Sequence, residues 1–137
     1  MKKQKKCKYS KNKLIRKRFK HLKDESLDNL NLKKITIKSS KLINTFFNKP
    51  QFFEVTFIDT IFDNVTIKKA KSVKDINFIN CTFKNCNILE SEFNIVSFEN
   101  CNFDNVTFKD FKIISSKIRN SKTKSMKFKN SNIQSLY

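Results

Sequence analysis

Apolar residues recur at every fifth position over most of the chain. The series begins at Leu27, admits one extra residue within 68–72, resumes at Val73 and ends at Ile133. Twenty-one of its twenty-two positions are apolar and only Thr123 breaks it, whereas apolar residues make up 38% of the whole chain. A period of five fits neither an α-helix nor a plain alternating strand. The pattern therefore predicts a backbone that turns a corner every five residues.

Two further columns of this repeat have a character of their own. Small or slim side chains stand two residues before the centres, at Cys81, Cys86, Ser91, Val96, Cys101, Val106, Ser116, Ser121 and Ser131. Asn, Asp and Ser, which favour turns, stand two residues after them. These expected corners are Asn80, Asn85, Asn100, Asn105, Asp110, Ser115, Asn120, Ser125, Asn130 and Ser135. We expect the centre and the residue two before it to face inward, and the others outward.

Segments such as Cys81 to Asn85 (CTFKN) and Cys101 to Asn105 (CNFDN) resemble the A-(D/N)-(L/F)-x-x pattern of the pentapeptide-repeat family. The resemblance covers about four-fifths of the chain. It implies an all-β fold, a right-handed quadrilateral β-helix in which four repeats make one coil of about twenty residues. The twenty-two repeats then make about five and a half coils, stacked at ~4.8 Å per strand layer to a height of about 26 Å.

The same pattern divides the chain into a basic N-terminal extension, residues 1–26, and a β-helix, residues 27–137. Within the extension, residues 1–11 are rich in lysine and lack core residues, so we expect a disordered tail. Residues 12–23 carry a narrow apolar stripe with helical spacing, and predict a short helix that caps the open end of the β-helix. The stripe consists of Ile15, Phe19 and Leu22.

The net charge of +18 is unevenly distributed. Residues 1–23 hold twelve basic and no acidic residues, residues 24–108 hold ten basic and eleven acidic, and residues 109–137 hold eight basic and one acidic. A neutral middle between two basic ends is suited to a polyanionic partner. An A+T-rich genome, whose codons favour Lys, Asn, Ile and Phe, is the alternative source of the lysines, but it does not explain their placement.

Two groups of basic residues are the predicted nucleic-acid-binding residues. The N-terminal group is Lys2, Lys3, Lys5, Lys6, Lys8, Lys11, Lys13, Arg16, Lys17, Arg18, Lys20 and Lys23. The C-terminal group, which we call the basic collar, flanks successive centres of the repeat and should point outward from all four walls of one coil. The collar consists of Lys112, Lys117, Arg119, Lys122, Lys124, Lys127 and Lys129. The aromatic residues, in contrast, are expected to lie in the core and not on an exposed platform for base stacking.

Catalytic and metal chemistry find little support in the sequence. His21 is the only histidine and lies in the basic segment, and the carboxylates are scattered. Cys81, Cys86 and Cys101 fall at inward positions without the Cys-x₂-Cys spacing of zinc sites, so we expect buried core thiols. Lysines around Cys7 should favour its thiolate. We therefore expect no enzyme activity, no metal, no cofactor and no small-molecule substrate.

These features together favour an intracellular, non-catalytic, structural RNA-binding protein. We expect a component of the ribosome, cytoplasmic or mitochondrial, or a factor bound to it, whose partners are rRNA phosphates and neighbouring ribosomal proteins. A basic, acid-free N-terminus leaves a transit peptide open, and no segment approaches the ~18 apolar residues of a transmembrane helix.

Two other functions stay open. The first is a protein-interaction scaffold, or an inhibitor or protector of a DNA-binding enzyme such as a topoisomerase. Some pentapeptide-repeat proteins take that role by resembling DNA in shape and acidity, but the charge of this chain argues against mimicry. The second is attachment to an anionic membrane surface through the basic segment.

Overall fold

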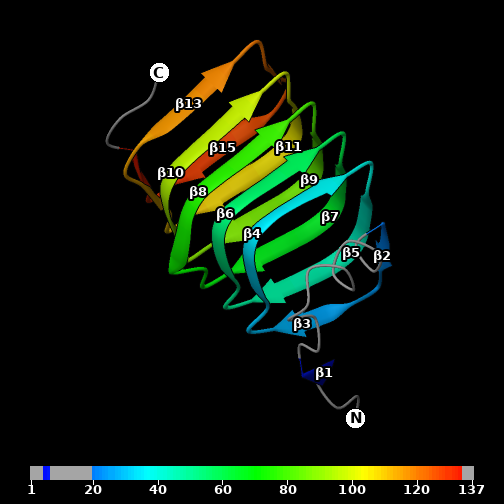
Figure 1. Cartoon of the computed structure of the whole chain (residues 1–137). Coiled ribbons are helices and arrows are strands. Elements are labelled where there is room, and N and C mark those ends of the chain that lie inside the picture. The colour runs from blue at the N-terminus through cyan, green and yellow to red at the C-terminus, as the bar shows by residue number, and fades with distance from the viewer. Residues whose placement is uncertain (1–4, 7–19, 134–137) are drawn as a thin grey trace.

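The protein is an all-β parallel solenoid of about six turns in the computed structural model, which describes residues 5–6 and 20–133. No helix occurs among these residues. The strands lie across the solenoid axis like the rungs of a ladder, with β1 to β3 at one end and β13 at the other (Figure 1). The predicted all-β β-helix is thus confirmed as a fold class, with about six turns where about five and a half were expected.

Most turns are built from two strands of eight residues. The strands are β1 (Lys5–Lys6), β2 (His21–Lys23), β3 (Ser26–Asp28), β4 (Asn31–Lys38), β5 (Lys41–Asn48), β6 (Gln51–Ile58), β7 (Ile61–Lys68), β8 (Ser72–Ile79), β9 (Thr82–Leu89), β10 (Glu92–Glu99), β11 (Asn102–Lys109), β12 (Lys112–Ile113), β13 (Ser116–Arg119), β14 (Lys122–Thr123), β15 (Met126–Lys129) and β16 (Asn132–Ile133).

All strand pairs are parallel and form two sheets. The first sheet holds β1, β2, β3, β5, β7, β9, β11, β14 and β15, and the second holds β4, β6, β8, β10, β12, β13 and β16. Over most of the solenoid, each residue pairs with the residue twenty positions later, as Asn31 does with Gln51. A side chain therefore lies directly next to its equivalent in the next turn, and each face is a set of stacked columns.

The corners are left-handed residues spaced five apart. Twenty non-glycine residues have φ between 48° and 63°, and thirteen of them are Asn or Asp, whose side chains tolerate this conformation. The corner prediction is confirmed for most of its positions but is wrong for Ser115 and Ser125, which are not left-handed. At those two corners, pairs of short strands replace the long strands. Ser135 lies outside the described residues.

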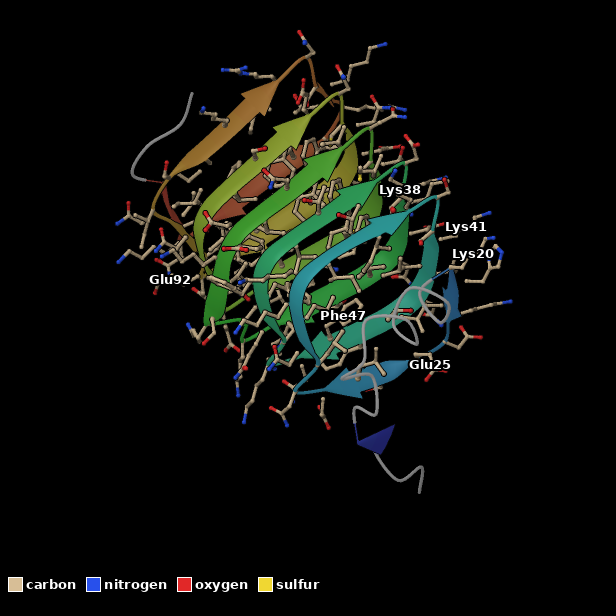
Figure 2. The ribbon with its side chains drawn as sticks, viewed as in Figure 1. Lys20, Glu25, Lys38, Lys41, Phe47 and Glu92 are labelled. Atoms are coloured by element: carbon tan, nitrogen blue, oxygen red, sulfur yellow. The ribbon has the colours of Figure 1, made fainter. Side chains whose placement is uncertain are left out.

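The interior consists of stacked columns of apolar side chains. Phe62, Phe83 and Phe103 stack nearly parallel in successive turns, with ring centroids 4.8 and 5.1 Å apart. The neighbouring column meets them edge-on, since the rings of Phe78 and Phe83 are 5.1 Å apart at 74°. Figure 2 shows Phe47 inside the coil. The repeat centres are buried from Leu27 to Ile113, as predicted.

The N-terminal start of the solenoid differs from the expectation. Leu22 was assigned to a capping helix, but it lies in strand β2, pairs with Leu42 and is buried. The helix prediction is therefore wrong for the last residues of the range 12–23. Leu22 stands five residues before Leu27, so it continues the apolar series, and the solenoid starts before the boundary drawn at residue 27. The stripe residues Ile15 and Phe19 lie outside the described residues.

The predicted one-residue insertion is confirmed. The pairing offset changes from twenty to twenty-one residues where Gln51 pairs with Ser72 and Ile61 with Thr82. The extra residue is accommodated in the linker between β7 and β8. There Ala70 is fully buried and its N–H donates to Ser91 Oγ at 3.0 Å, whereas Lys71 is exposed.

Candidate nucleic-acid interface

The basic collar occupies the last full turn of the solenoid. Its side chains come from strands β12 to β15 and, for Lys124, from the corner between β14 and β15, and so from all four faces, as the sequence predicted. Six of the seven are exposed, and Lys112 is half-buried beside Glu92 of the preceding turn. Within the described part of the chain, no carboxylate lies within 4 Å of these cations as an ion-pair partner. The collar charges are therefore available to an external anion.

Several inward side chains of this turn, in contrast to those of the preceding turns, are only partly covered by the described residues. Phe128 stacks on Phe108 with centroids 4.8 Å apart but remains 41% exposed. Ile118, Met126 and Ile133 are half-buried at the same end. The seven cations thus surround an apolar end of the solenoid, as far as residues 20–133 define it.

The structure does not bring the two predicted basic groups together. Lys20 and Lys23 are exposed on the first turn, and Lys5 and Lys6 form β1, which pairs with β3 at that end. The collar lies at the opposite end of the solenoid (Figure 1). The remaining N-terminal residues lie outside the described residues, namely Lys2, Lys3, Lys8, Lys11, Lys13, Arg16, Lys17 and Arg18. Lysines at this first end, such as Lys20, Lys38 and Lys41, point away from the coil (Figure 2).

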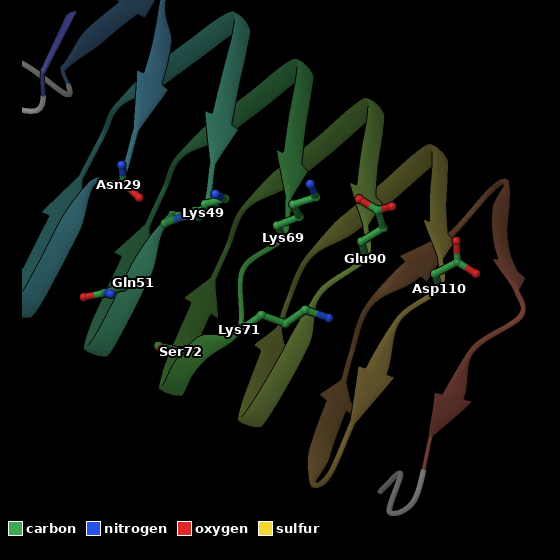
Figure 3. Close-up of a pocket in the computed structure, with 9 residues that line it drawn as sticks. Asn29, Lys49, Gln51, Lys69, Lys71, Ser72, Glu90 and Asp110 are labelled. Carbon is green, nitrogen blue, oxygen red and sulfur yellow. The ribbon is translucent and has the colours of Figure 1, made fainter. Parts of the chain in front are cut away.

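A third basic cluster, which the sequence analysis missed, lies around the inserted residue. Two open hollows of about 640 and 420 Å³ lie on either side of Lys71 and share Gln51, Lys71 and Ser72 in their linings. Because they share these three residues, we call the two hollows together the Lys71 groove. Figure 3 shows Lys71 projecting from the linker beside a corner column that contains Lys49, Lys69 and Glu90.

The wall side of the Lys71 groove contains an aromatic side chain that faces outward. Phe53 is half-buried and lies between Lys33 and Lys74, with which it pairs in the adjacent turns. The Nζ of Lys33 lies 5.8 Å from the centroid of the Phe53 ring. The expectation that all aromatics belong to the core is therefore wrong. Each Phe-Phe pair contains one inward and one outward ring, because successive strand residues alternate between faces.

The outward amides and carboxylates act mainly as structural ladders. Asn44 donates to Asp24 at 2.7 Å, and Asn64 donates to Asn44 at 2.9 Å, each across one turn of the same corner. On another face, Asn48 donates to Asp28 at 2.9 Å. These hydrogen bonds link successive turns, so the carboxylates involved have a structural role in holding the corners in register.

The three cysteines in the described range are buried thiols. Cys81 and Cys86 each donate to a core carbonyl, those of Phe57 and Phe62, at 3.3 Å. Burial raises the pKa of Cys86 to about 11. The hydrogen bond with Cys101, followed by burial, also raises the pKa of Cys81. The described residues contain no group of three or more His, Cys, Asp or Glu side chains placed to hold a metal ion.

Comparisons with known proteins add no further identification. No protein-family model matches the sequence, and no curated protein matches it. Among the described residues, no helix is long and apolar enough to cross a membrane. Functional inference therefore rests on the charges and grooves of the solenoid surface.

Proposed function

We propose that the protein is a non-catalytic RNA-binding scaffold, a pentapeptide-repeat β-helix whose basic ends contact RNA phosphates. The observation that carries this proposal is the basic collar, with cations on all four faces of one turn and no ion pair to a carboxylate in residues 20–133. Cations that stay unpaired at a protein surface bind phosphates and release counterions, which gives affinity without sequence preference.

The contrast between turns supports a specific role for these charges. At the same outward position before the centre, the turn above the collar has Glu92, Ser97, Asn102 and Thr107 where the collar has only lysines. Codon bias acts equally on both turns and does not predict this difference. The cations are concentrated where they encircle the solenoid.

Ribosomal RNA is the RNA we propose as the first candidate. A compact body with a long basic extension is typical of ribosomal proteins, and such extensions order on RNA. Because the collar and the N-terminal end lie at opposite ends of the solenoid, the body would bridge two RNA segments. Neighbouring ribosomal proteins would then contact its mixed-charge faces, in a cytoplasmic or mitochondrial ribosome.

The test is the salt dependence of binding to structured RNA. Replacing four collar residues with alanine should lower the log–log salt slope by about three, at roughly 0.7–0.9 per lost phosphate contact. The four are Lys117, Arg119, Lys122 and Lys124. Fluorescence anisotropy with a labelled rRNA fragment at several salt concentrations measures the slope.

The matched control removes four exposed lysines that lie outside both basic groups and are not among the lysines described at the first end, at Lys34, Lys49, Lys69 and Lys84. It has the same net charge as the collar variant, so a difference between the two isolates position from total charge. Equal slopes for the two variants, or weak binding of the unmodified protein at ~150 mM salt, would contradict a specific role for the collar.

A further inference from the structure

We infer that the Lys71 groove is a binding site for a single-stranded RNA segment, with one base stacked on Phe53. This inference rests on the proposed RNA-binding function and adds a site on a different turn of the solenoid from the basic collar. Its basis is the combination of an outward aromatic ring, flanking lysines and a hollow in one place.

The stacking surface is the first element of the site. Phe53 is half-buried at an outward position of a sheet wall. At the same position, the other turns have the polar residues Lys33, Lys74 and Asn94. Aromatic rings in basic grooves bind unpaired bases by stacking, with little dependence on base identity. Lys33 covers the ring at 5.8 Å in this structure. Such an exposed cation–π contact is weak and can be exchanged for a base and its phosphate.

The charges around the ring are the second element. Lys33 and Lys74 lie on either side of Phe53 along the solenoid axis, and Lys71 borders both hollows of the groove. All three are exposed. A strand running along the wall would place phosphates next to these lysines on both sides of the stacked base. Glu92 also lines the hollow that contains Phe53, which we call the wall hollow, and its carboxylate limits the basic path there.

The third element of the site is the pair of hollows next to the linker that contains the inserted residue. The extra residue lies in the linker at this corner, and Lys71 and Ser72 at the end of that linker line both hollows. Gln51 lies in both hollows and is exposed, and Asn31 and Asn94 line the wall hollow. Their amides can donate to and accept from base edges. A duplex hides its bases, so the site is suited to an unpaired segment.

The absence of tryptophan makes a direct test possible. The chain contains no Trp, so Phe53→Trp introduces a single reporter that can still stack. Adding a short single-stranded oligouridylate to the full-length variant should quench its emission in a saturable way. The matched control is Phe46→Trp, an outward, half-buried ring on another face, between Ser26 and Thr66 of the adjacent turns. Its emission should not change at the same RNA concentrations.

Affinity measurements separate stacking from charge. Phe53→Leu, which keeps apolar area but removes the ring, should weaken binding of the oligouridylate about tenfold and leave the salt slope unchanged. Lys74→Ala should lower the slope by about one. Binding of a duplex RNA of equal length should not respond to Phe53→Leu. Thermal unfolding of each variant checks that the fold is intact.

The outcomes distinguish this inference from the proposed function. If structured RNA binds with a collar-dependent slope but Phe53→Trp is not quenched and Phe53→Leu binds the oligouridylate normally, the groove site is wrong and the collar function stands. If Phe53→Leu weakens single-stranded binding while the collar variant behaves like its charge-matched control, the groove is the RNA site and the collar is not. If no RNA binds at ~150 mM salt, both are overturned.

Discussion

Ile95 is the most unusual residue of the solenoid corners. It has φ 63°, and it is the only β-branched residue among the left-handed residues of the described chain. Its side chain is 44% exposed, so burial does not account for its presence there. A left-handed residue with a Cβ costs about 1–2 kcal/mol, which Asn partly avoids through local hydrogen bonds.

Replacing Ile95 with Asn should therefore stabilise the protein. We expect Ile95→Asn to raise the free energy of unfolding by about 1 kcal/mol, because most other corners already use Asn or Asp. Urea denaturation measures the change. Ile61→Asn is the control, since Ile61 is similarly exposed at 40% but is not left-handed. A gain of the same size in both variants would contradict an origin in backbone strain.

Cys86 should make the folded protein less stable at high pH. Its pKa is raised from 9.0 to about 11 by burial, so between these values the unfolded thiol loses its proton while the folded thiol keeps it. The folded state then binds more protons than the unfolded state, and stability falls as pH rises from 9 to 11. The loss should be on the order of 2 kcal/mol.

The measurement is the free energy of unfolding of wild type and Cys86→Val between pH 8 and 11. Val is suited to this position because Val106, its partner in the next turn, is buried at the equivalent place. The difference between the two proteins should change with pH in the direction given above. Parallel curves over this range would show that Cys86 does not contribute.

At the scale of elements, the stacked rings join the turns. Phe103 is 1% exposed, stacks on Phe83 at 5.1 Å and 4°, and meets Phe98 edge-on at 5.1 Å. Its removal leaves a cavity between two turns that the rigid backbone pairing cannot close. We expect Phe103→Ala to reduce the free energy of unfolding by at least about 3 kcal/mol.

Urea denaturation of Phe103→Ala tests the register of the repeat. Phe46→Ala, which removes a half-buried outward ring, is the control and should cost clearly less. If Phe103→Ala leaves the unfolding curve unchanged, the inward assignment of this column is wrong.

The strands were predictable from the sequence because their determinants are local and repeated. Each centre and its small neighbour alternate with polar residues, so the register follows from the pattern alone, including the shift near Lys71. Ser115 and Ser125 were mispredicted because Ser has no fixed corner preference, as the left-handed Ser39 shows. Leu22 was mispredicted because three apolar residues with helical spacing outweighed its place in the five-residue series.

At the scale of the molecule, the face and turn of each charged residue could be predicted from the sequence, but the hollows around those residues could not. The repeat assigns each lysine to a face and a turn, which gave the basic collar directly. The Lys71 groove depends on where the linker with the inserted residue places Lys71, and on which of two adjacent phenylalanines faces outward. The outward position of Phe53 could have been predicted from the sequence, because its neighbour Phe52 already occupies the inward position.

The strand edges at the collar end have a consequence for how copies of the chain meet. In the described part of the chain, β13, β14, β15 and β16 each pair with one strand only. Free edges of this kind can template the addition of strands from other molecules and lead to fibres. Two chains meeting at these edges would bring two rings of seven cations together, and their mutual repulsion opposes polymerisation at low ionic strength. A polyanion that neutralised the collar would remove this barrier, so the same side chains would govern both RNA capture and the tendency of the protein to assemble end to end.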